Sequence, residues 1–196
     1  MRFGPLPNFR AMPNADEQWC RFKEVIATPE PPMLGPQRRN GTMSEGEVMQ
    51  SLDSFFGMQK IPESTRPLLR SAVLLWHDHL DASHTISQGI ETREGSWLHG
   101  IMHRREPDYG NAKYWFRRVA PHAAFPKLAG RVTALLKNDV TGLSKRLIDN
   151  GEWKPFAFID ECERVERSND AALNSTLRKI QAAEFEVLVQ HIFQNA

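Results

Sequence analysis

Five of the seven histidines lie between residues 77 and 103. Imidazole is the commonest metal ligand and titrates near neutral pH, so a histidine cluster is the strongest chemical signal in this chain. The five are His77, His79, His84, His99 and His103. Such residues do chemistry only if they converge, and convergence depends on the elements that carry them.

The first three histidines fall on a segment that we expect to form one helix over residues 66–88. Successive helical residues advance by about 100°. His77, Asp81 and His84 therefore share one narrow stripe, at i, i+4 and i+7, with apolar side chains mainly on the opposite arc. His79 falls within the apolar arc, which predicts a core histidine.

The next expected helix begins near Ser96 and is stopped by Pro107. Its stripe carries His99, His103 and Glu106 at i, i+4 and i+7. Helices joined by a short connection tend to pack antiparallel, so the two stripes would face each other. The predicted metal ligands are His77, Asp81, His84, His99, His103 and Glu106. Such mixed imidazole and carboxylate shells suit a divalent Zn, Fe, Mn or Ni ion.

Two observations limit this hypothesis. The motif HGIMH at residues 99–103 lacks the glutamate after the first histidine that a zinc protease uses as its base. A polar stripe opposite an apolar one is also what any surface helix shows, so solvated or hydrogen-bonded faces remain the alternative. His122 and His191 lie outside the stripes, and we expect no role for them.

The segment that follows, residues 103–118, is rich in arginine and aromatic side chains. Guanidinium groups bind carboxylate or phosphate in a bidentate manner, which predicts a site for a small anionic ligand. The predicted anion-binding residues are Arg104, Arg105, Lys113 and Arg117. The alternatives are aromatics in the core with arginines paired to acids, or single-stranded nucleic acid. The overall net charge of +1 disfavours nucleic acid.

The elements around these motifs are predicted to be helical. Ser44 followed by Glu47 is a capping box, Asp108 can cap a helix over residues 109–119, and Asn169 or Asp170 can cap a long C-terminal helix. Few segments alternate apolar and polar residues over strand length. The predicted fold is an all-α, single-domain helical bundle over residues 43–196.

Residues 1–42 hold seven of the thirteen prolines. Proline removes amide donors and disfavours helix in the residue before it, which predicts an irregular arm with one short helix near residues 16–26. Aromatic residues such as Trp19 and Phe22 favour an arm packed on the body.

Composition narrows the class of protein. No apolar run approaches the roughly 18 residues that cross a bilayer, and the first residues lack the apolar core of a signal peptide. The two cysteines, Cys20 and Cys162, form no CxxC motif and no disulfide framework. We therefore expect a cytoplasmic protein without a membrane partner, while its oligomeric state stays open.

Residues 98–119, LHGIMHRREPDYGNAKYWFRRV, resemble the signature of a family of bacterial and fungal proteins with no assigned activity. Residues 74–100 and 153–163 resemble the flanking blocks of the same family, so the resemblance covers roughly residues 65–165. It implies a shared fold and brings no activity or cofactor with it.

Two functional hypotheses follow from the residues. The first is a small helical metal-binding protein, extended to a metalloenzyme in which Arg104 or Arg105 orients an anionic small molecule. The second is a non-enzymatic helical module that docks a protein or small-molecule partner through its arginine and aromatic surface.

Overall fold

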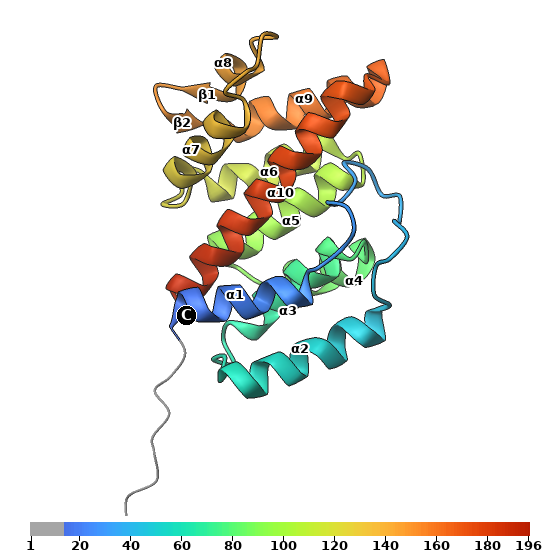
Figure 1. The fold of residues 1–196 in the computed structure, drawn as a ribbon, viewed down its shortest axis with the longest axis vertical. Helices are drawn as coiled ribbons and strands as arrows, with labels where there is room; N and C mark the ends of the chain where they lie inside the picture. The colour runs from blue at the N-terminus through green and yellow to red at the C-terminus, as the bar shows by residue number, and fades with distance from the viewer. Residues whose placement is uncertain (1–13) are drawn as a thin grey trace, which may run out of the picture.

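The computed structural model describes residues 14–196 of the chain, and the first thirteen residues of the predicted arm lie outside them. The described part is all-α, as predicted, with one minimal hairpin (Figure 1). Its elements are α1 (Ala15–Val25), α2 (Glu45–Gln59), α3 (Arg66–Trp76), α4 (Leu80–Ser87), α5 (Arg93–Arg105), α6 (Tyr109–Val119), α7 (Phe125–Leu135), α8 (Leu143–Leu147), β1 (Ile148–Asp149), β2 (Glu152–Trp153), α9 (Pro155–Ser168) and α10 (Ala171–Gln194). Within this range, every helix is too short or too polar to cross a membrane.

Local capping chemistry sets several helix starts where the sequence predicts them. The Ser44 hydroxyl accepts from the backbone N–H of Glu47 at 3.4 Å, and the Glu47 carboxylate accepts from the backbone N–H of Ser44 at 2.7 Å. Asp108 accepts from the N–H of Asn111 at the start of α6, and Asp170 caps α10 in the same way. These bonds satisfy amide donors that have no partner inside the helix.

The α5–α6 hairpin lies at the centre of the molecule, and α10 runs diagonally past it in Figure 1. Gly100 lets the two helices of the hairpin approach, because a Cβ there would lie 2.7 Å from a ring carbon of Phe116. The buried Glu184 carboxylate on α10 accepts from the indole N–H of Trp97 at 3.1 Å and pairs with Arg104 at 2.5 Å. Close packing against α6 and the contacts with Glu184 of α10 therefore fix the position of α5.

The described part of the N-terminal arm packs on the body. Phe22 of α1 is fully buried, and its ring lies edge-on to Phe55 at 5.6 Å and to Phe193 at 5.3 Å between centroids. Residues 27–43, which we call the strap, then cross from α1 to α2 without regular secondary structure.

The single helix predicted over residues 66–88 is wrong, because the chain breaks between α3 and α4. Asp78 adopts a left-handed conformation with φ of +68°. The N–H of His79 donates to the carbonyl oxygen of Leu74 at 2.9 Å, and the N–H of Asp78 donates to the carbonyl oxygen of Leu75 at 3.3 Å. This pattern is a Schellman motif, in which aspartate replaces the usual glycine.

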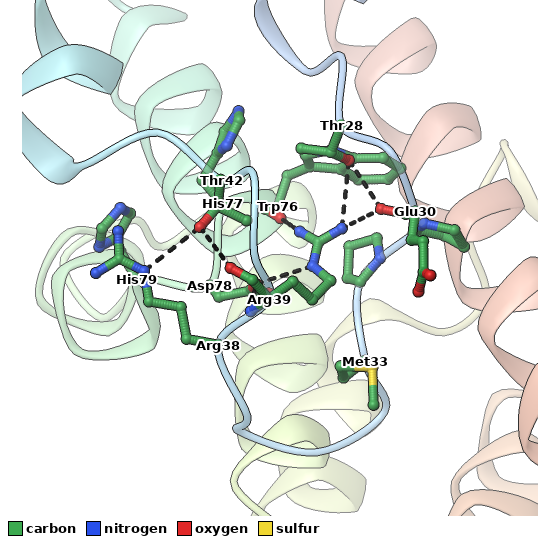
Figure 2. Close-up of polar contacts among 12 residues, drawn as sticks. Thr28, Glu30, Met33, Arg38, Arg39, Thr42, Trp76, His77, Asp78 and His79 are labelled. Atoms are coloured by element: carbon green, nitrogen blue, oxygen red, sulfur yellow. Dashed lines mark hydrogen bonds and ion pairs between the residues drawn. The ribbon is translucent and has the colours of Figure 1, made fainter.

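Arg39 and Arg105 hold Asp78 in this conformation, and Figure 2 shows the contact with Arg39. From the strap, Arg39 donates to one carboxylate oxygen through both Nε at 2.8 Å and its backbone N–H at 3.0 Å. Arg105 of α5 donates to the other oxygen at 2.6 Å. The Asp78 side chain is 0% exposed and those of Arg39 and Arg105 are 7% and 1% exposed. Burial raises the pKa of Asp78, but the bonds from Arg39 and the charge of Arg105 outweigh it and hold that pKa below its usual value.

We predict that Asp78→Asn destabilises the protein by about 3–5 kcal/mol, because it leaves two buried guanidinium groups without a counter-charge. Denaturant unfolding at neutral pH measures the loss. Asp81→Asn, at an exposed position on α4, is the matched control and should stay within about 0.5 kcal/mol of the parent. A loss below about 1 kcal/mol for Asp78→Asn would contradict a structural role for this ion pair.

Candidate metal centre

Three of the predicted ligands converge where α4 packs against α5. His84 comes from α4, while His99 and His103 lie one turn apart on α5. One ring nitrogen from each lies within 4.8 Å of those of the other two. We call His84, His99 and His103 the three-histidine cluster.

The ring positions in the cluster are close to those that one ion requires. Nε2 of His99 lies 3.0 Å from Nε2 of His103. The centroid of the His84 ring lies 4.7 Å from that of His99 and 5.2 Å from that of His103. Two nitrogens bound to one tetrahedral zinc at about 2.0–2.1 Å lie about 3.3 Å apart. The spacing is therefore within a few tenths of an ångström of that around a shared ion, and the proton that one Nε2 carries in this contact must move before both can bind the ion.

The wall of the cluster is aromatic. The indole of Trp115 on α6 stacks on the His99 ring with centroids 3.9 Å apart, and the guanidinium of Arg118 lies 5.0 Å from the Trp115 ring centroid on the same helix. His99 is 2% exposed and the His103 side chain 11%, while His84 is half-buried. The cluster is thus closed on the α6 side.

The electrostatics keep the buried imidazoles neutral. Burial lowers the pKa of His99 to about 4, assisted by the positive charge that His103, His84 and Arg118 would place nearby. Burial also lowers the pKa of His103, and the charge of Glu106 only partly opposes this. Neutral imidazole is the form that binds metals. Both buried rings are therefore in the neutral form at neutral pH.

Glu106 lies beside the cluster but behind the His103 ring. Its carboxylate is 3.5 Å from Nδ1 of His103, on a different edge of the ring from the Nε2 that faces His99, and the Asp108 carboxylate is 3.9 Å from the same Nδ1. Among residues 14–196, neither Nδ1 of His99 nor Nδ1 of His103 has a hydrogen-bond partner, although both are buried. Glu106 is therefore placed to contact His103, whereas the atoms that could bind an ion directly are the ring nitrogens of the three histidines.

The structure does not bring His77 and Asp81 into this cluster. His77 ends α3, and its Nδ1 accepts from the N–H of Met43 at 3.1 Å while its Nε2 donates to the carbonyl of Val25 at 3.0 Å. Both ring nitrogens are therefore used, in a residue that is 0% exposed. Asp81 lies exposed on α4 outside the cluster. The break at Asp78 removes the register that would have aligned His77 and Asp81 with His84.

The four predicted anion-binding residues are also separated. The side chain of Arg104 is 0% exposed and pairs with Glu184, and Arg105 is buried against Asp78. Lys113 pairs with Asp160 at 2.5 Å, while Arg117 is exposed. Core acids thus neutralise the two residues that were expected to orient an anion. A cavity of about 650 Å³ between the strap, α9 and α10 has no lining residue from the three-histidine cluster.

A second titratable cluster, which we call the Glu94 cluster, joins Glu94, His122 and His191. Sequence reasoning missed it because the three residues are far apart in the chain and share no local motif. Nδ1 of His122 accepts from the N–H of Ala124 at 3.1 Å, so its Nε2 carries the proton and donates to Glu94 at 3.2 Å. Both nitrogens of His122 are therefore used, which disfavours a metal at this cluster.

Comparisons of the chain with protein-family models, curated proteins and solved structures returned no match. The resemblance noted for residues 98–119 stays a prediction.

We predict that the metal-free protein loses stability as the pH falls from about 6.5 to about 4. The folded pKa of His99 lies below its ordinary value of 6.5, so its contribution is fully present above that value and is lost as the unfolded chain takes up the proton. A shift to about 4 corresponds to at most about 3 kcal/mol. Urea unfolding at pH 7 and pH 4.5 measures this loss. The His99→Gln variant should show a smaller pH dependence than the parent, and equal slopes would contradict the assignment.

Proposed function

We propose that the protein binds one divalent transition-metal ion through His84, His99 and His103. The observation that carries the proposal is the convergence of three imidazole nitrogens, from two packed helices, within 4.8 Å. Two of the rings are largely buried with lowered pKa values, so they are neutral at pH 7. In His77 and His122, by contrast, both ring nitrogens take part in hydrogen bonds within the protein, so neither nitrogen is left to bind an ion.

The donor set narrows the choice of ion. With Asp81 outside the cluster and Glu106 behind His103, the direct donors are imidazoles alone. Imidazole suits zinc, nickel, iron and copper, whereas manganese, magnesium and calcium prefer oxygen ligands. Of the four ions that the sequence predicts, we therefore propose zinc, nickel or iron as the resident ion in preference to manganese.

Metal binding is the extent of this proposal. A metalloenzyme that turns over an anionic molecule would need a substrate cleft and an anion-binding group beside the ion. Arg104 and Arg105 are committed to Glu184 and Asp78, and the 650 Å³ cavity is lined by other residues. The proposed site is therefore assigned to ion binding, with three protein ligands and any further coordination position open to water or a small anion.

Elemental analysis of protein purified without a histidine tag tests the proposal, together with zinc titration of the metal-free form. The parent should bind about one equivalent of zinc, and His99→Ala/His103→Ala should bind none at the same site. His191→Ala is the matched control, because it removes an imidazole from the Glu94 cluster and should leave the stoichiometry unchanged. Far-UV circular dichroism confirms that each variant is folded.

Two results would overturn the proposal. One is a folded parent that takes up no zinc, nickel or iron. The other is binding that survives loss of His99 and His103 but disappears in His191→Ala, because the ion would then belong to the Glu94 cluster.

A further inference from the structure

Glu106 is the one acid beside the three-histidine cluster that has no other task among the described residues. It follows the last residue of α5, and its only ion-pair contact within residues 14–196 is the 3.5 Å approach to Nδ1 of His103. Asp108, which is 3.9 Å from the same nitrogen, is committed elsewhere, because it caps α6 and accepts from the N–H of Asn111 at 3.1 Å and from its side-chain amide at 2.6 Å. The Glu106 carboxylate is therefore available to contact His103.

The contact between His99 and His103 requires a definite arrangement of protons. Their Nε2 atoms lie 3.0 Å apart, so in the neutral pair one Nε2 carries a proton and the other accepts it. A lone pair on Nδ1 of His103 would face the carboxylates of Glu106 and Asp108 and be repelled by them. The proton of His103 is therefore on Nδ1, and its Nε2 accepts from the Nε2–H of His99. That proton of His99 must leave Nε2 before both rings can bind one ion.

We propose that Glu106 is a positioning residue of the metal site. Its carboxylate holds His103 in the Nδ1–H tautomer and fixes the ring so that Nε2 is available to the ion. This inference rests on the proposed metal site. Carboxylates behind ligating histidines fix the tautomer and raise ligand basicity, and their loss typically costs 10–100-fold in metal affinity.

The distance in the structure agrees with this role. At 3.5 Å the contact between Nδ1 and the carboxylate is an electrostatic approach, longer than a hydrogen bond. An ion on Nε2 would draw electron density from the ring and make the Nδ1–H a stronger donor, so the contact should shorten when the ion binds. The Glu106 side chain is 31% exposed, so it can move by the required few tenths of an ångström without repacking the core.

The experiment compares zinc affinity in the full-length parent, Glu106→Gln, Glu106→Ala and Asp81→Asn by competition with a chromophoric chelator. We expect Glu106→Ala to weaken binding at least tenfold, with Glu106→Gln between it and the parent because its amide oxygen still accepts a hydrogen bond. Asp81→Asn removes the same charge one turn before His84 and should change the affinity less than twofold. This control separates the specific contact from a general loss of negative charge.

A second measurement reports the tautomer directly. The ¹⁵N shifts of the His103 ring in the metal-free protein should show Nδ1–H in the parent and a mixture of tautomers in Glu106→Ala. A purely structural role for Glu106 would not produce this change.

The outcomes separate this inference from the proposed function. If the folded parent does not bind zinc, the metal site itself fails. If the parent binds zinc and Glu106→Ala binds it equally well, or if the His103 tautomer is unchanged in that variant, the metal site stands and the role of Glu106 is refuted. A tenfold loss that Asp81→Asn reproduces would also refute it.

Discussion

The buried carboxylate of Asp78 is the interaction on which the arrangement of the N-terminal half depends. It accepts from Arg39 of the strap and from Arg105 of α5, while its own backbone ends α3 in a left-handed conformation. Three segments far apart in the chain therefore meet at one side chain. Because the group carries one negative charge against two positive ones in a buried position, every member depends on the others for compensation. The break in the helix and the docking of the strap are two consequences of the same ion pair.

The ion pairs of Arg104 and Arg105 on α5 also determine where the histidines of that helix point. Consecutive residues on a helix point about 100° apart, so His103, Arg104 and Arg105 reach three different neighbours. Arg105 holds the α3–α4 break, Arg104 binds Glu184 on α10, and His103 faces α4. The two buried ion pairs fix the rotation of α5 about its axis. With Arg104 and Arg105 fixed in these directions, His99 and His103 are turned toward His84 and Trp115.

The described residues contain two clusters of histidine and acidic side chains, which differ in the group that approaches Nδ1 of a histidine. In the Glu94 cluster the backbone N–H of Ala124 occupies Nδ1 of His122, so the proton lies on Nε2 and points at Glu94. In the three-histidine cluster the Glu106 carboxylate lies 3.5 Å from Nδ1 of His103, and we propose that it keeps the proton on Nδ1 and the lone pair on Nε2. On this proposal, the tautomer set by the group behind the ring determines which cluster presents an unprotonated nitrogen to an ion.

Local sequence determined several helix starts and two of the three histidines of the candidate site. Capping at Ser44, Asp108 and Asp170 uses partners within three residues, and the i, i+4 spacing of His99 and His103 places both on one face of any helix that contains them. Only the tertiary structure decided that His84 joins them while His77 and Asp81 do not, because the break at Asp78 is held by Arg39 and Arg105, which lie 39 and 27 residues away. It likewise decided that Arg104 and Arg105 are core residues, since their partners Glu184 and Asp78 are themselves buried. The spacing of residues along the chain shows which face of a helix a side chain occupies. The charged partner that packs against that face comes from a distant segment, so only the folded structure identifies it.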